Sequence, residues 1–151
     1  MKSWIGIDPG ASGCLCHLFE DNTVTFIDFK ATKLLGYITY LEATDLSDVC
    51  MVATEAVHAM KGQGVSSMFS FGQRLGELEG MLQTLHIGYE LVRPQAWQKS
   101  CQITPKSGKQ GTFQVMSKLY PSALLTGPKG GILDGRCDAL GIAHYLRKTY
   151  N

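Results

Sequence analysis

The chain has 151 residues, of which 44% are apolar and 18% charged, and its formal net charge is +1. This length favours one domain with a substantial core, spanning 1–151, and is too short for two. No apolar run approaches the roughly 20 residues of a membrane-spanning helix, and no signal segment precedes the first predicted strand, so we expect a cytoplasmic protein without a membrane partner.

The first part of the chain predicts short strands followed by a helix. Segments 2–8, 13–20 and 23–29 are rich in Val, Ile, Phe and Trp and are separated by Pro-Gly and Asp-Asn turn signals, which is typical of a three-stranded meander. A helix is predicted over about 32–41. The continuous apolar run at 49–54 is typical of a strand in the middle of a parallel sheet.

The second part predicts one more strand among helices. A long helix is expected over about 66–85, and a fifth strand within "YELVRP". Further helical segments are expected at 94–99, 109–119 and 134–150. This alternation predicts an α/β fold with a mixed five-stranded sheet and helices on both of its faces.

Two features of composition bear on partners and environment. Residues 1–90 include five basic and eleven acidic residues, whereas 91–151 include nine basic and two acidic ones. This asymmetry indicates that a polyanion faces the second half, although lysines that merely solvate helix faces would give the same counts. The five cysteines are odd in number and lack the paired CxxC spacing of zinc sites, so we expect reduced core residues.

Four acidic residues are predicted to converge at one edge of the sheet. Asp8 ends the first strand and Glu55 follows the fourth, and the carboxyl ends of neighbouring central strands are where ligands bind in such sheets. Asp134 and Asp138 lie one helical turn apart and share a face if a helix begins there. Four acids in one cleft are unfavourable unless cations lie between them. A pair of magnesium ions about 4 Å apart would meet this need and would hydrolyse a phosphodiester.

Three of these acids also have ordinary structural explanations. Asp8 precedes Pro-Gly and could form a turn. Asp134 could cap the last helix, and Asp138 would then be favourable in its first turn. Glu55 is harder to explain in this way because it directly follows six mostly apolar residues. The combination of all four favours the metal site.

The same residues carry a resemblance to a known family. "IGIDPGASG" near the start, Glu55 after the fourth strand and "DGRCDALGIAHYL" near the end resemble the motifs of RuvC-type Holliday junction resolvases of the ribonuclease H-like superfamily. The DxxxD spacing and the "DGRxDAL" pattern resemble the chloroplast branch most. Because the chain leaves no room for a transit peptide, we expect a bacterial or bacteriophage-infected host cytoplasm.

The resemblance implies a fold, an activity and a partner. It implies a ribonuclease H-like nuclease domain and a homodimer that binds four-way junction DNA during recombination and repair. Paired symmetric nicks would use two magnesium or manganese ions and no small-molecule cofactor. By position, the metal ligands are Asp8, Glu55, Asp134 and Asp138.

Basic and polar residues near these acids are candidates for DNA contacts. In similar resolvases the loop that follows the second acid enters the centre of the junction. Lys109, after "TPKSG", resembles a catalytic lysine held near the scissile phosphate, and Lys106 is close enough in sequence to be confused with it. A plain glycine-rich connector and solvated lysines are the alternatives. The candidates for contacts with bases or phosphates are His58, Met60, Lys61, Gln63, Arg74, Lys106, Lys109 and Arg136.

The long predicted helix carries glycine at every fourth position, Gly72, Gly76 and Gly80. Each costs a helix about 1 kcal/mol relative to Ala, so the repeat needs a packing reason. Close contact with the sheet or with the same helix of a partner would supply one, and the resemblance favours the partner.

Two other functions remain open on the same fold. One is a ribonuclease that degrades RNA:DNA hybrids, although Glu55 at a strand end does not match the helical second acid usual in such enzymes. The other is a non-catalytic nucleic-acid-binding protein, which would be expected to lack one of the four acids.

Overall fold

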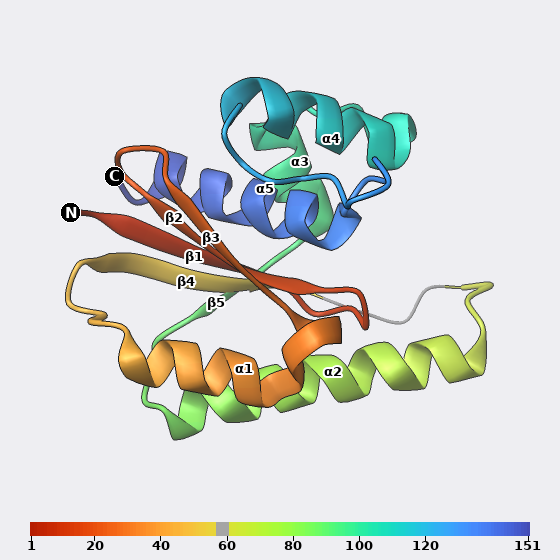
Figure 1. Ribbon diagram of the computed structural model, residues 1–151. Coiled ribbons are helices and arrows are strands. Elements are labelled where there is room, and N and C mark those ends of the chain that lie inside the picture. Colours follow the sequence, from red (N-terminus) through yellow and green to blue (C-terminus); the bar gives the residue numbers. More distant parts are fainter. Residues whose placement is uncertain (57–60) are drawn as a thin grey trace.

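The computed structural model describes residues 1–56 and 61–151, and all the predicted strands and helices are present among them (Figure 1). The elements in chain order are β1 (Ser3–Asp8), β2 (Cys14–Phe19), β3 (Val24–Asp28), α1 (Phe29–Ala43), β4 (Val49–Glu55), α2 (Val65–Thr84), β5 (Glu90–Val92), α3 (Pro94–Ser100), the 3-10 turn η1 (Pro105–Ser107), α4 (Gly108–Leu119) and α5 (Asp134–Thr149). The differences from prediction lie at the ends of elements.

Helix α1 differs most because it starts directly at the end of β3. Its first turn begins at Phe29, and Lys33, with a positive φ of 58°, separates that turn from the helix that follows. The residues after Lys33 carry the helical pattern that the sequence predicts. Strand β4 extends to Glu55 because its last residues, from Ala53 onward, pair with β5.

The five strands form one mixed sheet in the order β3-β2-β1-β4-β5. Strand β1 pairs antiparallel with β2 and parallel with β4, so it lies in the middle of the sheet. Strand β2 pairs antiparallel with β3, and β4 pairs parallel with β5. The carboxyl ends of β1 and β4 therefore lie side by side.

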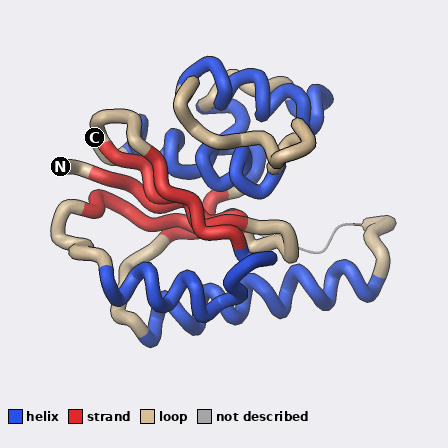
Figure 2. The backbone as a smooth tube through the Cα atoms, viewed as in Figure 1, coloured by secondary structure: helices blue, strands red, loops and turns tan. Residues whose placement is uncertain are grey.

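Helices cover both faces of the sheet, as predicted. Helices α1 and α2 lie on one face, and α5 lies on the other with α3 and α4 outside it (Figures 1 and 2). Each face has its own apolar core. Ile5, Ile7 and Leu82 belong to the core beneath α1 and α2, whereas Trp4 and Leu140 belong to the core beneath α5.

Two glycines let α5 lie directly on the centre of the sheet. A Cβ added at Gly6 in β1 would meet the carbonyl oxygen of Ala139 at 2.4 Å, and one added at Gly135 would meet the carbonyl oxygen of Ser12 at 2.0 Å. Neither position has room for a side chain. The start of α5 is thereby held against the end of β1 and the loop that follows it.

The cysteines and the glycine repeat of α2 can now be placed. Cys14, Cys16, Cys101 and Cys137 are buried and Cys50 is half-buried, and none of the five forms a disulfide. A Cβ added at Gly72, Gly76 or Gly80 would meet nothing within 4 Å in the described chain, so of the two alternatives for the repeat, packing on the sheet is excluded, and contact with a partner stays a prediction. Among the described helices, none is both long and apolar enough to cross a membrane.

Candidate active site

Asp8 and Glu55 end the two central parallel strands. Ile7 lies opposite Thr54 in the register of β1 and β4, so the next residue of each strand, Asp8 and Glu55, lies at the same edge. The Pro-Gly turn holds Asp8 as well, because the backbone N–H of Gly10 donates to its Oδ1 at 3.4 Å. Asp8 can therefore form the turn and also belong to the group of four acids.

Asp134 and Asp138 reach the same place from the first turns of α5. Leu133 is the N-cap residue, so Asp134 is the first residue of the helix and not its cap. All four acids, Asp8, Glu55, Asp134 and Asp138, line one cleft of about 630 Å³. The convergence that the sequence predicts is confirmed.

The four carboxyl groups influence one another electrostatically. Burial, followed by the charges of Glu55 and Asp134, raises the pKa of Asp8 to about 7. Burial raises the pKa of Asp138 to about 8, with further contributions from Asp8, Glu55 and Asp134, while the charge of Lys109 lowers it. Burial also raises the pKa of Glu55. Like charges are therefore crowded into a site that a cation would stabilise.

Two of the acids have partners of opposite polarity. The indole N–H of Trp97 in α3 donates to Glu55 Oε2 at 2.7 Å. Lys109 Nζ in α4 lies 3.3 Å from Asp134 Oδ2. The first contact orients Glu55 at the wall of the cleft, and the second places the exposed Lys109 beside Asp134.

The acids fit a divalent metal by the chemistry of their donor atoms. Carboxylate oxygens are the ligands that magnesium and manganese prefer, and a bound cation would stabilise the charged forms of Asp8 and Asp138, whose pKa values burial and, after it, the neighbouring carboxylates raise. In the present arrangement, no three or more His, Cys, Asp or Glu side chains of residues 1–56 and 61–151 are gathered tightly enough to hold an ion.

The other predicted DNA contacts fall in different surroundings. Lys61 and Gln63 lie between β4 and α2, where Lys61 is exposed and Gln63 half-buried. Lys106 is exposed in η1, and Arg74 lines the cleft from α2. His58 and Met60 lie outside the described residues.

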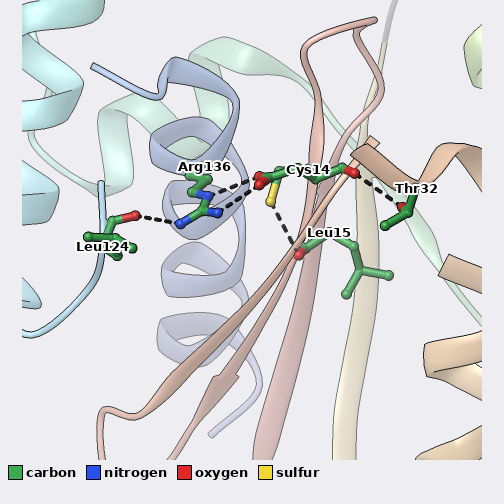
Figure 3. Close-up of polar contacts among 6 residues, drawn as sticks. Cys14, Leu15, Thr32, Leu124 and Arg136 are labelled. Carbon is green, nitrogen blue, oxygen red and sulfur yellow. Dashed lines mark hydrogen bonds and ion pairs between the residues drawn. The ribbon is translucent and has the colours of Figure 1, made fainter. Parts of the chain in front are cut away.

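Arg136 takes part in an internal contact that the sequence did not predict (Figure 3). Its Nε and Nη2 donate to the two carboxylate oxygens of Asp28 at 2.9 and 2.7 Å, and its Nη1 donates to the carbonyl oxygen of Leu124 at 2.9 Å. Only 17% of the side chain is exposed. The guanidinium joins the start of α5 to β3 and to the preceding loop, which leaves it little surface for DNA and gives it a structural role.

Two parts of the site could not be inferred from the sequence pattern. Trp97 belongs to a short helix, and no local signal indicates that its indole reaches Glu55. The second wall of the cleft comes from α2, and beside Arg74, which the sequence predicts as a DNA contact, it includes Ser66, Ser67, Ser70 and Phe71, which the sequence does not predict. Their helical spacing is visible in the sequence, but the direction in which this face points is not.

Comparisons with known proteins relate the fold to RuvC. No family model matches the chain, and no curated protein matches it. RuvC of T. thermophilus in complex with a Holliday junction substrate matches with a TM-score of 0.65 at 15% identity, covering 99% of this chain and 96% of that one. The Thermus thermophilus RuvC structure matches with a TM-score of 0.58 at 15% identity, covering 97% of this chain and 96% of that one. The chain therefore has the ribonuclease H-like fold of RuvC.

Proposed function

We propose that this protein is a metal-dependent endonuclease that resolves four-way DNA junctions by paired nicks. The observation that carries the proposal is the convergence of Asp8, Glu55, Asp134 and Asp138 on one cleft. A fold shared along almost the whole chain with a RuvC that was solved with a Holliday junction substrate supports the choice of DNA partner.

The four acids would hold divalent ions, magnesium or manganese, by their carboxylate oxygens. When bound, such ions supply an activated water and stabilise charge on the leaving oxygen in phosphodiester hydrolysis. Asp8 and Glu55 present their oxygens from rigid central strands, and Asp134 and Asp138 from one helix face. Rigid elements of this kind hold ligands more reproducibly than loops do.

Residues around the acids have supporting roles in this proposal. Trp97 orients Glu55 through the hydrogen bond of 2.7 Å that its indole N–H donates to Oε2 of Glu55. Lys109, 3.3 Å from Asp134, places a positive charge where negative charge develops on the phosphate. His58, Met60, Lys61 and Gln63 follow Glu55 in the chain and are proposed to contact the junction, with Lys106 as a further phosphate contact.

The proposal also includes a homodimer, because two copies related by a two-fold axis would match the symmetry of a four-way junction. The motif spacing in α5 favours the chloroplast branch of resolvases over the bacterial one. The whole chain is proposed to form a single nuclease domain. Its proposed location is the cytoplasm of a bacterium or of a bacteriophage-infected host.

The experiment compares cleavage of three substrates of equal length: a synthetic four-way junction, a linear duplex and an RNA:DNA hybrid. Each is incubated with Mg²⁺ and with a chelator. We expect nicking of the junction that requires metal. Preferential degradation of the hybrid would instead identify a ribonuclease, and metal-independent cleavage would contradict the proposed site.

Variants of the acids test whether the cleft performs the reaction. Asp8→Asn and Glu55→Gln should each lower the cleavage rate at least about a hundredfold, while the junction still binds. Glu42→Gln, at an exposed position near the end of α1, is the matched control and should cleave at the wild-type rate. A junction that is cut normally by Asp8→Asn would overturn the assignment.

A further inference from the structure

The wall of the cleft that belongs to α2 carries hydrogen-bond donors rather than acids. Ser66, Ser70 and Arg74 are spaced four residues apart, so they share one face of the helix. All three line the same cleft as Asp8 and Asp138. The two serines are exposed and Arg74 is half-buried, so their polar groups are accessible from the cleft.

Arg74 is held in place from two sides. Its Nη1 donates to Glu77 Oε2 at 2.6 Å, one turn further along α2. Its guanidinium carbon lies 5.1 Å from the ring centroid of Phe29, a buried residue at the start of α1. A guanidinium has five N–H donors, and within the described chain only this one nitrogen has a hydrogen-bond partner. The remaining N–H groups belong to a side chain that is already held in position. Little conformational entropy is therefore lost when Arg74 binds a ligand.

The chemistry of the two walls defines the ligand that fits between them. On the acidic wall, the ligand must offer a group that binds the same cation as the carboxylates. On the α2 wall, it must offer anionic or neutral oxygen atoms that accept hydrogen bonds from Arg74 and the serines. A phosphodiester strand presents both, because each successive phosphate carries one negative charge that is shared by two non-bridging oxygens. The guanidinium fork matches a phosphate in geometry as well as in charge.

We propose that Arg74, with Ser66 and Ser70, binds a phosphate adjacent to the scissile one on the strand that is cut. This assignment rests on the proposed nuclease function and specifies, in addition, that the strand to be cut passes along the α2 wall of the cleft. Arg74 is a positioning residue: it takes no part in bond breaking and sets the path of the strand past the acids. Glu77 and Phe29 orient it for this contact.

The test measures binding of the four-way junction by fluorescence anisotropy in Ca²⁺ over a range of salt concentrations, followed by single-turnover cleavage in Mg²⁺. Arg74→Ala should weaken binding about tenfold and lower the slope of log affinity against log salt by about one. Arg74→Lys should restore the slope but only part of the affinity, because it keeps the charge without the fork. Ser70→Ala should weaken binding about twofold to threefold.

Lys2→Ala is the matched control, since Lys2 is exposed and precedes β1, at the end of that strand opposite to Asp8. It should leave the affinity and the salt slope at their wild-type values. If the wild-type protein nicks the junction but Arg74→Ala has normal affinity and slope, the strand-positioning role is overturned and the nuclease function stands. If the wild-type protein does not nick, the proposed function itself fails. A melting curve for each variant separates loss of contact from loss of fold.

Discussion

Lys109 lies beside the cleft and, unlike the charged residues that line it, is exposed. Its side chain is 74% accessible, yet Nζ lies 3.3 Å from Asp134. An exposed ion pair contributes little to stability, so this contact is better explained by chemistry on a phosphate. We predict that Lys109→Ala slows single-turnover cleavage about tenfold to a hundredfold and weakens junction binding much less.

Lys118→Ala is the control for Lys109, because Lys118 is an exposed lysine in the last turn of the same helix, α4. It should leave both the affinity for the junction and the cleavage rate at their wild-type values. If Lys109→Ala lowered the cleavage rate and the affinity equally, Lys109 would only bind a phosphate and would not assist the reaction.

His17 links the stability of the fold to pH. The ring is buried in β2, its Nδ1 lies 2.8 Å from the hydroxyl of Tyr40, and its Nε2 has no partner among the described residues. Burial lowers the pKa of His17 from 6.5 to about 4. The unfolded chain therefore binds the proton more readily. The stability that neutral His17 contributes is fully present above pH 6.5 and is lost as the pH falls towards 4.

We predict that wild-type protein loses about 2 kcal/mol more unfolding free energy than His17→Phe between pH 7 and pH 4. Urea denaturation at several pH values, followed by circular dichroism, measures the difference. His144, with a pKa also lowered to about 4 by burial, remains in both proteins and its contribution cancels. Parallel pH profiles for the two proteins would show that His17 does not titrate as expected.

At the scale of elements, the contact between α5 and β1 brings three of the four acids together. Gly6 faces backbone atoms of α5, with Ala143 N only 2.6 Å from the position of an added Cβ. Backbone cannot move aside as a flexible side chain can, so Gly6→Ala must push the helix from the sheet. We predict a loss of about 2 kcal/mol or more in unfolding free energy, and a fall in cleavage because Asp134 and Asp138 move with the helix.

Gly88→Ala is the control for Gly6→Ala, since a Cβ at Gly88 would meet nothing within 4 Å and its φ is not positive. Its stability and activity should stay at the wild-type level. A stable and active Gly6→Ala protein would mean that α5 does not depend on this close approach.

Most elements, and the meeting of the acids, could be predicted because their signals are local or follow from sheet topology. Alternating and continuous apolar runs identify the strands, and a parallel pair of neighbouring strands brings Asp8 and Glu55 together. The kink at Lys33 and the pairing of Arg136 with Asp28 could not be predicted. The kink falls at a lysine, which carries no turn signal. The pairing depends on how β3 and α5 meet in space, because Arg136 and Asp28 are 108 residues apart in the chain.

At the scale of the whole molecule, the carboxyl ends of β1 and β4, which carry Asp8 and Glu55, lie at one end of the sheet and the chain termini at the other (Figure 1). The fold is similar to that of RuvC over 99% of the chain at only 15% identity, so this arrangement of elements does not depend on many shared residues.

One stripe of α2 remains uncovered in the single chain. Val65 is 80% and Phe69 73% exposed, and they share a helix face with the open positions Gly72, Gly76 and Gly80. Large exposed apolar residues beside glycines favour close contact with a second copy of this helix. We predict that the wild-type protein sediments as a dimer and that Gly76→Leu sediments as a monomer with unchanged helix content, because a Cβ at Gly76 has no neighbour within 4 Å among residues 1–56 and 61–151. Gly88→Leu, also at an open position, should remain dimeric. Sedimentation equilibrium measures the three masses, and a wild-type monomer or a dimeric Gly76→Leu would show that the glycine stripe does not join two copies.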